Sequence, residues 1–570
     1  MNTKGIQDYE LRHSASHLMA SAVKELYPNV KIAIGPAIQD GFYYDFDNLE
    51  ISDSDLKKIE KKMRQIAEKN LSFEKSESNS AEAKKILKDE PYKSELLKSL
   101  KGKITFYKHG DFTDMCEGPH VKTTKEIRHF KLTKLAGAYW KGNSANKMLT
   151  RIYGIVFKTE KELKDYLQLI EEAKKRDHVK LGKELNLFSL HPEGPGFPFW
   201  HPKGTILFNE LKNYLTNQNH KRNYDEIMTP QILNEELWHK SGHYENFKEN
   251  VYFVDIDNKS YAVKPMNCPG GLLIYKKGLH SYRQLPIKNA EFGLVHRHEL
   301  SGVLHGLFRA RSFTQDDAHV FCTPEQLQTE IEDCIEYIQE TYKDFGFKEI
   351  LTFIATQPEK SIGSKQDWDL ATKSLEKSLD TCKLKYKIKE GEGAFYGPKI
   401  EFNIKDALGR LWQCGTIQID FSMPRRFEAT YEAKDNSKQT PIMIHRAVVG
   451  SLERFTGILI EHYAGKFPLW LSPEQVRVLT VTEKNDKYAK EIFKELKEAG
   501  LRVSLDIKPN SISKKVREAQ LEKVNYMVTI GDKEQEKNTL AIRTREGKVK
   551  FEVKIDDFIK ELKQEITKKQ

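Results

Sequence analysis

Two arginines separated by a turn are the residues whose types and spacing most directly suggest chemistry. Arg297 and Arg309 stand twelve positions apart, with Gly302 and Gly306 between them, and the stretch that follows alternates in character as a strand does. Residues 297–322 are therefore typical of a β-hairpin. Because a guanidinium makes bidentate, charge-assisted bonds to phosphate, the hairpin could hold a triphosphate. The same pattern also fits a surface hairpin whose charges are solvated.

A second group combines two histidines with a cysteine–histidine pair about a hundred residues later. His13 and His17 lie in a segment whose apolar residues recur with helical period, so they share one helix face. Cys116 and His120 follow in a turn-like segment. These residue types and spacings suit a zinc site, and they also suit a hydrolytic pocket that positions a water molecule. The histidines could equally be polar members of a core.

Cysteine spacing, the lack of common nucleotide-binding motifs and the lack of long apolar runs argue against several classes of protein. The six cysteines form no CxxC pair, which argues against a disulfide framework and a thiolate zinc knuckle. No GxxxxGK[ST] phosphate loop and no dinucleotide fingerprint occurs. No apolar run approaches the ~18 residues of a membrane span, and the N-terminus lacks a signal region, so we expect a cytoplasmic protein without membrane contact. The net charge of +10 fits an anionic partner.

The elements that must position these residues fall into several domains, because 570 residues are too many for one core. The segment 159–186 contains a long, charged, amphipathic pattern that predicts a linker helix after a first domain at 1–158. Strands around the arginines predict an antiparallel sheet within 187–471. Strands alternate with helices in 472–570, which predicts a small α/β domain with a largely parallel sheet. This last region holds 23 Lys and Arg against 18 Asp and Glu.

Three stretches together resemble a known family. Residues 297–322 resemble motif 2 of class II aminoacyl-tRNA synthetases, and 441–465, which contains Arg454, resembles motif 3. With KPMNCPGG at 264–271 they are similar to the threonyl-tRNA synthetase family, from about His13 to the C-terminus. The resemblance implies an α+β multidomain fold, with an α+β editing domain, an antiparallel-sheet class II catalytic domain and an α/β anticodon-binding domain. Family members often begin with a further small domain, which we expect this form to lack.

The resemblance implies the activity and its cofactors. ATP, with Mg²⁺, would activate L-threonine to threonyl-adenylate, and the threonyl group would pass to the 3′ ribose of tRNA(Thr). One zinc ion per chain would be held by Cys268, His319 and His445, which the sequence alone could not group. A zinc ion with one open place would bind the threonine amine and hydroxyl and reject valine.

The resemblance also assigns roles to individual residues. Arg297, Arg309 and Arg454 would be catalytic and bind ATP, together with Glu299 near the adenine and Gln418 near the ribose. The threonine pocket would contain Gln315, Asp317, Tyr396, Lys399 and Gln413. An editing site that hydrolyses seryl-tRNA would consist of His13, His17, Asp114, Cys116 and His120, positioning water rather than a metal. Anticodon bases would meet Asn510, Glu534, Arg543 and Arg545.

Motif 1 is expected within residues 211–232, where Met228, Thr229 and Pro230 carry the resemblance and would lie at a homodimer interface. Two other functions compete with this interpretation. A related ligase for serine or proline is disfavoured by the set Cys268, His319 and His445. A synthetase-like binding or regulatory protein without catalysis usually loses a motif 2 or motif 3 arginine, and all of these are present.

Overall fold

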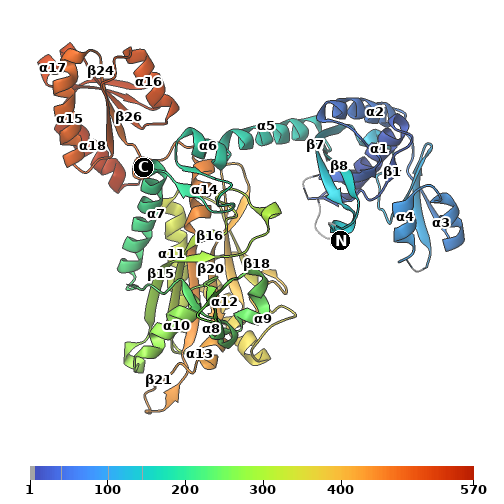
Figure 1. Cartoon of the computed structure of the whole chain (residues 1–570), viewed down its shortest axis with the longest axis horizontal. Helices are drawn as coiled ribbons and strands as arrows, with labels where there is room; N and C mark the ends of the chain where they lie inside the picture. Colours follow the sequence, from blue (N-terminus) through green and yellow to red (C-terminus); the bar gives the residue numbers. More distant parts are fainter. Residues whose placement is uncertain (1–6, 40, 101, 144, 570) are drawn as a thin grey trace. The chain divides into compact units, whose positions relative to one another are not determined.

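The computed structural model describes residues 7–39, 41–100, 102–143 and 145–569 (Figure 1). The chain divides into two compact units, residues 1–171 and 172–570. None of the helices among the described residues is long and apolar enough to cross a membrane.

The first unit is an α+β structure built around helix α1 (Tyr9–Leu26). The buried face of α1 packs with α2 (Leu56–Glu68) on an antiparallel sheet in the order β1-β3-β8-β7, with β2 paired to β3. These strands are β1 (Lys31–Ile32), β2 (Ala37–Ile38), β3 (Gly41–Asp47), β7 (His129–Tyr139) and β8 (Met148–Phe157). A second antiparallel sheet contains β4 (Glu74–Ser78), β5 (Ile104–His109) and β6 (Phe112–Met115), beside α3 (Ser80–Ile86) and α4 (Pro91–Leu97).

The predicted single linker helix is in fact two helices. Helix α5 (Glu160–Arg176) has no buried residue among those described, and α6 (His178–Glu184) follows after one residue. Asp177 leaves the helical conformation, and its carboxylate accepts the N–H of Lys180 at 2.9 Å. The aspartate is therefore an N-cap that starts a new helix, which a charge pattern continuous over both helices could not indicate.

The second unit is organised around an eight-stranded sheet in the order β11-β15-β16-β23-β20-β19-β17-β18. The strands are β11 (Asp225–Glu226), β15 (Ile287–His296), β16 (Ser312–Cys322), β17 (Ile350–Ala355), β18 (Tyr386–Lys389), β19 (Lys399–Lys405), β20 (Leu411–Asp420) and β23 (Ile442–Ser451). Pairing is antiparallel except at the two edges, so the prediction of an antiparallel sheet is confirmed. Its core includes residues of helices α7 (Pro202–Lys221), α11 (Leu327–Asp344), α12 (Lys365–Thr381) and α14 (Leu452–His462).

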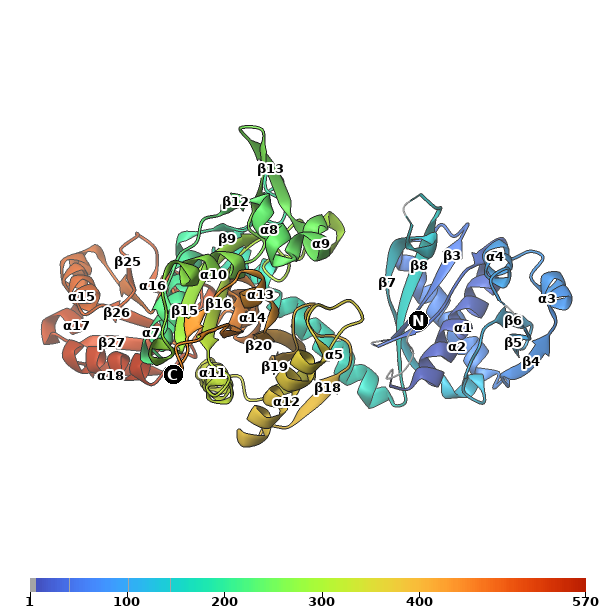
Figure 2. The same ribbon diagram turned by 90° about the horizontal axis from the view of Figure 1, so that it is seen from below.

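Smaller elements surround this sheet, and the β13–β14 hairpin projects from it (Figure 2). They are β9 (Phe188–Ser189), β10 (Phe199–Trp200), β12 (Ile232–Asn234), β13 (Tyr252–Ile256), β14 (Lys259–Val263), β21 (Tyr431–Glu432), β22 (Lys438–Gln439), α8 (Glu235–Ser241), α9 (His243–Phe247), α10 (Cys268–Lys277) and α13 (Ser422–Arg426).

The C-terminal part of the second unit is an α/β domain with five strands in the order β25-β24-β26-β27-β28. They are β24 (Val476–Thr480), β25 (Val503–Asp506), β26 (Tyr526–Ile530), β27 (Leu540–Thr544) and β28 (Val549–Val553). Its helices are α15 (Asp486–Glu498), α16 (Ile512–Leu521), α17 (Asp532–Lys537) and α18 (Ile555–Thr567). The first three strands are parallel, but β27 and β28 are antiparallel, so the predicted parallel sheet holds for only part of the domain.

Candidate active sites

A cavity of about 380 Å³ lies between β16, β20, β23 and α14. Six of the predicted site residues line it: Arg297, Glu299, Arg309, Gln315, Gln413 and Arg454. The predicted returning strand is shorter than expected, since β16 begins only at Ser312. Phe308 and Arg309 instead form a tight turn, in which both backbone N–H groups donate to His305 O. Arg309 therefore lies in this turn, before the strand that carries Gln315.

The three predicted phosphate-binding arginines are held differently. Arg297 donates from Nε to Pro265 O at 3.2 Å, and burial lowers its pKa, so a bound anion would offset the cost of its charge. Arg309 is half-exposed and pairs with Glu299 Oε2 at 3.0 Å. The backbone N–H of Arg454 is capped by Ser451 Oγ, and its Nε donates to Phe308 O at 3.0 Å.

Phe313 was not among the predicted site residues, although it lines the same cavity. Its ring centroid lies 5.1 Å from the Arg297 guanidinium, a cation–π geometry, and an aromatic ring in the wall of a cavity suits stacking by a planar base. The signal in the sequence was an aromatic residue two positions before Gln315 on a strand whose other pocket-facing side chains are polar.

The predicted zinc ligands come together in the structure. The ligand atoms of Cys268, His319 and His445 all lie within 4.8 Å of one another. Cys268 begins α10, while His319 and His445 are direct cross-strand partners on β16 and β23. His319 is buried, and neither of its ring nitrogens has a hydrogen-bond partner among the described residues. Because an unpaired buried imidazole is costly, this donor set fits a bound cation, and one cysteine with two histidines suits zinc.

The predicted threonine pocket adjoins these ligands. Asp317 accepts a hydrogen bond from Asn267 Nδ2 at 3.1 Å, and its carboxylate lies 3.8 Å from His319 Nε2. Tyr396 donates its hydroxyl to Gln418, and its ring lies 5.1 Å from that of His445. Lys399 is engaged in an ion pair with Glu401 at 2.7 Å.

A buried histidine that the sequence did not single out also approaches this group. His243 Nε2 lies 3.9 Å from Cys268 Sγ, and its Nδ1 bonds to Ser241 Oγ at 2.8 Å. Burial lowers the pKa of His243 to about 4, so it is neutral at physiological pH. Nothing in the local sequence distinguishes it from a surface histidine, because Cys268, which it approaches, lies 25 residues further along the chain on α10.

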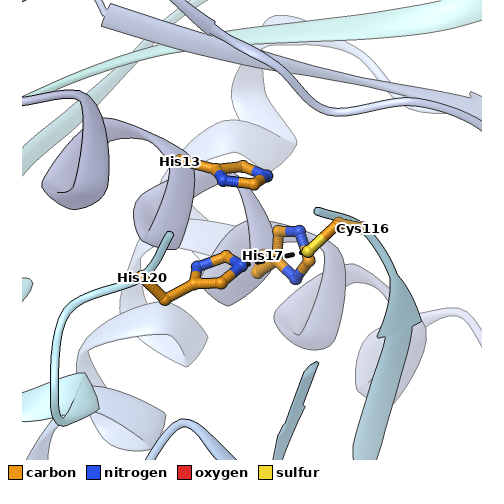
Figure 3. Close-up of side chains that lie close together, drawn as sticks. All are labelled: His13, His17, Cys116 and His120. Carbon is orange, nitrogen blue, oxygen red and sulfur yellow. Dashed lines mark hydrogen bonds between the residues drawn. The ribbon is translucent and has the colours of Figure 1, made fainter. Parts of the chain in front are cut away.

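In the first unit, the second group of predicted residues also converges (Figure 3). His13 and His17 project from α1, and Cys116 and His120 follow β6. Cys116 Sγ lies 3.2 Å from His120 Nε2, and His13 Nδ1 lies 3.3 Å from Pro119 O. Burial lowers the pKa of His13 to about 4 and of His120 to about 2, and raises that of Cys116 to about 12. At neutral pH the cluster therefore holds neutral imidazoles and a protonated thiol.

Asp114 connects this cluster to two residues that the sequence did not indicate. Its carboxylate pairs with Lys93 Nζ at 2.6 Å and accepts from the Tyr44 hydroxyl at 2.5 Å, and His17 Nε2 lies 3.6 Å away. All four side chains are buried. Lys93 lies on α4 in a segment that looks like a charged surface helix, so only the fold shows that its ammonium points inward.

The predicted anticodon residues are spread over the C-terminal domain. Asn510 accepts from Lys514 Nζ at 3.2 Å, and Glu534 accepts from the N–H of Gly531 at 3.0 Å. Arg543 lies on β27, and its Nη1 reaches Gly547 O at 3.4 Å. Arg545 donates to Phe467 O at 2.9 Å and pairs with Glu546 at 3.3 Å.

The antiparallel sheet with its arginine-lined cavity, and the α/β domain that follows it, define a class II aminoacyl-tRNA synthetase. Residues 252–463 match the family described as tRNA synthetase class II core domain (G, H, P, S and T). Residues 475–565 match the family described as Anticodon binding domain. Residues 104–153 match the Threonyl and Alanyl tRNA synthetase second additional domain.

Individual relatives narrow the class further. The chain is 54% identical over 561 residues to a threonine–tRNA ligase of Clostridium tetani, and the match covers 98% of this chain and 88% of the relative. It is also 54% identical over 564 residues to that of Acetivibrio thermocellus, covering 98% and 89%. A solved structure titled as the RNA binding domain of threonyl-tRNA synthetase from Cryptosporidium parvum superposes with a TM-score of 0.67 at 41% identity, covering 68% of this chain and 98% of that one. The chain belongs to the threonine–tRNA ligase family.

Proposed function

We propose that this protein joins L-threonine to tRNA(Thr) in two steps, through threonyl-adenylate, and hydrolyses seryl-tRNA(Thr) at a separate site. The observation that carries the proposal is the cavity formed by Arg297, Arg309 and Arg454, with Gln315 at its wall and Asp317 beside His319 two residues further along β16. We also propose four segments: an editing domain at 1–158, a linker at 159–186, a catalytic domain at 187–471 and an anticodon-binding domain at 472–570. The cytoplasm, where tRNA is charged, remains the predicted location.

Activation needs positioning and charge stabilisation rather than a covalent enzyme intermediate. We propose that the threonine carboxylate attacks the α-phosphate of ATP in line and that pyrophosphate leaves. Arg297 and Arg454 would donate to the phosphate oxygens on which charge accumulates, in a site that excludes most water. Phe313 would stack on the adenine, and Glu299, once released from Arg309, would accept from its amino group. Mg²⁺ that accompanies ATP would neutralise further phosphate charge.

Discrimination between amino acids depends on whether the substrate provides hydrogen-bond or metal-binding partners for the polar groups of the pocket. Cys268, His319 and His445 would hold zinc, which when bound supplies an open place for an amine and a hydroxyl. Asp317, fixed by Asn267, would accept a hydrogen bond from the same groups of the substrate. An amino acid without a hydroxyl would leave these polar groups unsatisfied and be rejected strongly.

Serine has both the amine and the hydroxyl, so these polar groups do not reject it. It differs from threonine only by a methyl group, which changes the binding free energy by roughly 1–3 kcal/mol and discriminates only ~10 to 200-fold. We propose that the first unit removes the resulting error. Neutral His13, His17 and His120 would hold a water molecule, whose oxygen attacks the seryl ester carbonyl while its proton passes to an imidazole. The ester bond then breaks, and serine and the tRNA 3′ hydroxyl are released. Lys93 and Tyr44 would fix Asp114 beside His17.

A homodimer is the proposed assembly. Met228 is 89% exposed, Leu279 is 99% exposed, and Leu273 and Ile274 on α10 are also exposed. Gly270 of α10 packs so closely on Thr229 that a side chain there would contact it at 2.9 Å, so α10 and the motif 1 segment are adjacent. Exposed apolar side chains on adjacent segments favour a protein–protein contact.

The decisive experiment is ATP–pyrophosphate exchange with each of the twenty amino acids in turn. We expect exchange to be fastest with threonine, weaker with serine, and near background with valine. Fastest exchange with serine or proline would instead support a related ligase of the same class. No exchange with any amino acid would support a binding or regulatory protein and overturn the proposal.

A further inference from the structure

The start of α6 contains a buried histidine that belongs to none of the sites above. His178 is the first residue of α6, and its side chain is fully buried. Its Nδ1 lies 2.7 Å from Glu461 Oε1 near the end of α14, and its Nε2 lies 3.0 Å from the backbone N of Leu307. His178 thus touches both segments that carry the predicted motif 2 and motif 3 arginines.

These two contacts determine the tautomer of His178. A backbone N–H can only donate, so Nε2 accepts from Leu307, and Nδ1 must carry the proton that it donates to Glu461. The backbone N–H of His178 donates to the same carboxylate oxygen at 3.0 Å, and the other oxygen accepts from Arg410. The ring is therefore held in one orientation with Nε2 facing the Leu307 amide.

The segment that His178 holds forms part of the wall of the ATP cavity. Leu307 and Phe308 both line it, and the Phe308 ring packs against the His178 ring with centroids 3.9 Å apart. The carbonyl oxygen of Phe308 accepts the Nε–H of Arg454 at 3.0 Å. Two hydrogen bonds, joined by a single dipeptide, therefore connect the His178 ring to the Arg454 guanidinium.

Gly306 allows this close approach. Its φ is +50°, and a Cβ at this position would lie 2.2 Å from His178 Nε2. A side chain at position 306 would thus displace either the ring or the segment. The contact between His178 and the Leu307 N–H therefore depends on two features, the fixed orientation of the imidazole and the absence of a side chain at Gly306.

We infer that His178 is a positioning residue for ATP, which fixes the Leu307–Phe308 segment and, through the Phe308 carbonyl, orients Arg454 toward the phosphates. The inference rests on the proposed function, since it takes Arg454 as an ATP ligand. Removing the acceptor leaves the Leu307 N–H buried without a partner, so the segment shifts to find one. The residues of the predicted threonine pocket lie on β16, on β20 and at or just before the start of β19, and none of them is a hydrogen-bond or ring partner of His178.

The test uses two variants that each keep one half of the imidazole's hydrogen bonding. In His178→Gln the side-chain oxygen can still accept from Leu307, whereas in His178→Asn the amide can still donate to Glu461 but reaches no further. In ATP–pyrophosphate exchange by the full-length protein, we expect His178→Asn to raise KM for ATP about tenfold or more and KM for threonine less than about twofold. His178→Gln should stay within about threefold of wild type for both.

A third variant keeps the test decisive if His178→Asn does not fold. Gly306→Ala disturbs the same contact from the other side and should reproduce the ATP defect with His178 intact. An unchanged KM for ATP in a folded His178→Asn protein, or equal increases for ATP and threonine in all three variants, would overturn the inference. If wild type shows no threonine-dependent exchange, the proposed function fails instead, and equilibrium ATP binding by the same proteins then decides the role of His178.

Discussion

His319 shows at the scale of one residue why a metal is expected. Its imidazole is buried, lies against that of His445 at a centroid distance of 5.1 Å, and has no hydrogen-bond partner among the described residues for either nitrogen. We predict about one tightly bound zinc per chain and loss of threonine activation in His319→Ala with the fold retained. Metal analysis and circular dichroism check this, and active protein that contains no zinc would contradict it.

Measuring the zinc content also shows whether one or both of the clusters of histidine and cysteine side chains bind metal. The editing cluster also presents four possible ligands within 4.8 Å, so a stoichiometry of two zinc ions would indicate that it binds metal as well. The variant pair Cys268→Ser and Cys116→Ser assigns the ion, since only the first should lower the zinc content.

Arg454 tests the assignment of the ATP site. Arg454 lines the cavity and would meet charge that develops on the phosphates, so Arg454→Ala should lower kcat/KM for pyrophosphate exchange by a factor corresponding to at least ~3 kcal/mol. Threonine affinity, measured by titration calorimetry, should be nearly unchanged. Near-normal exchange by the variant would mean that motif 3 has been misassigned. Arg425→Ala, at a surface ion pair with Asp367, is the matched control.

The editing residues are tested by hydrolysis of preformed seryl-tRNA. We predict that His13→Ala with His17→Ala, or Cys116→Ala with His120→Ala, abolishes deacylation and leaves threonylation intact, because the cluster lies in a unit with its own core. Seryl-tRNA should then accumulate in charging assays that contain serine. If both double variants hydrolyse seryl-tRNA as fast as wild type, these four residues are only core members.

At the scale of elements, a buried ion pair shapes β16, the strand that carries Gln315 and Asp317 of the predicted threonine pocket. The register between β16 and β23 shifts between Gln315 and Asp317, and the Asp316 carboxylate fills the gap by accepting the N–H groups of Val448 and Val449 at 2.7 and 3.0 Å. Its other oxygen pairs with the buried Arg446 at 2.8 Å. This irregularity separates the neighbouring pocket residues from regular pairing, as bulges near active sites often do.

Asp316→Ala should therefore destabilise the second unit by about 3–5 kcal/mol, because it leaves a buried guanidinium without a counterion. Denaturant unfolding measures this change. The control is Arg425→Ala, which removes the 54% exposed partner of Asp367 and should cost less than ~1 kcal/mol. Equal effects in the two variants would show that the buried pair does not hold the bulge.

The elements also show what the sequence could and could not predict. Local patterns were sufficient for α1, for the antiparallel sheet and for the α/β domain, since apolar periodicity is a local property. The family resemblance supplied Cys268, His319 and His445. Neither source indicated Lys93, because its role depends on how α4 folds back on β6.

At the scale of the whole molecule, the proposed homodimer can be tested at the motif 1 segment. Met228→Asp places a charge on an exposed apolar surface, so we predict dissociation to monomers in sedimentation experiments and a loss of exchange activity. The matched control is Leu521→Asp, also exposed but in the C-terminal domain. A dimer that persists in Met228→Asp, or a wild-type monomer, would contradict this assembly.

The order of strands also determines when each unit can form during synthesis. The sheet of the first unit closes once β8 has been made, near residue 157, whereas β16 waits for β23, whose last residue is 451. Elongation at ~5–20 residues per second separates these events by roughly 15 to 60 s. Each nascent chain thus carries a completed first unit and an unfinished sheet of the second unit on the ribosome, with the backbone edge of β16 that later pairs with β23 still unpaired. When translation of this chain is slow, folding of the second unit should consequently depend on chaperones more than folding of the first unit does.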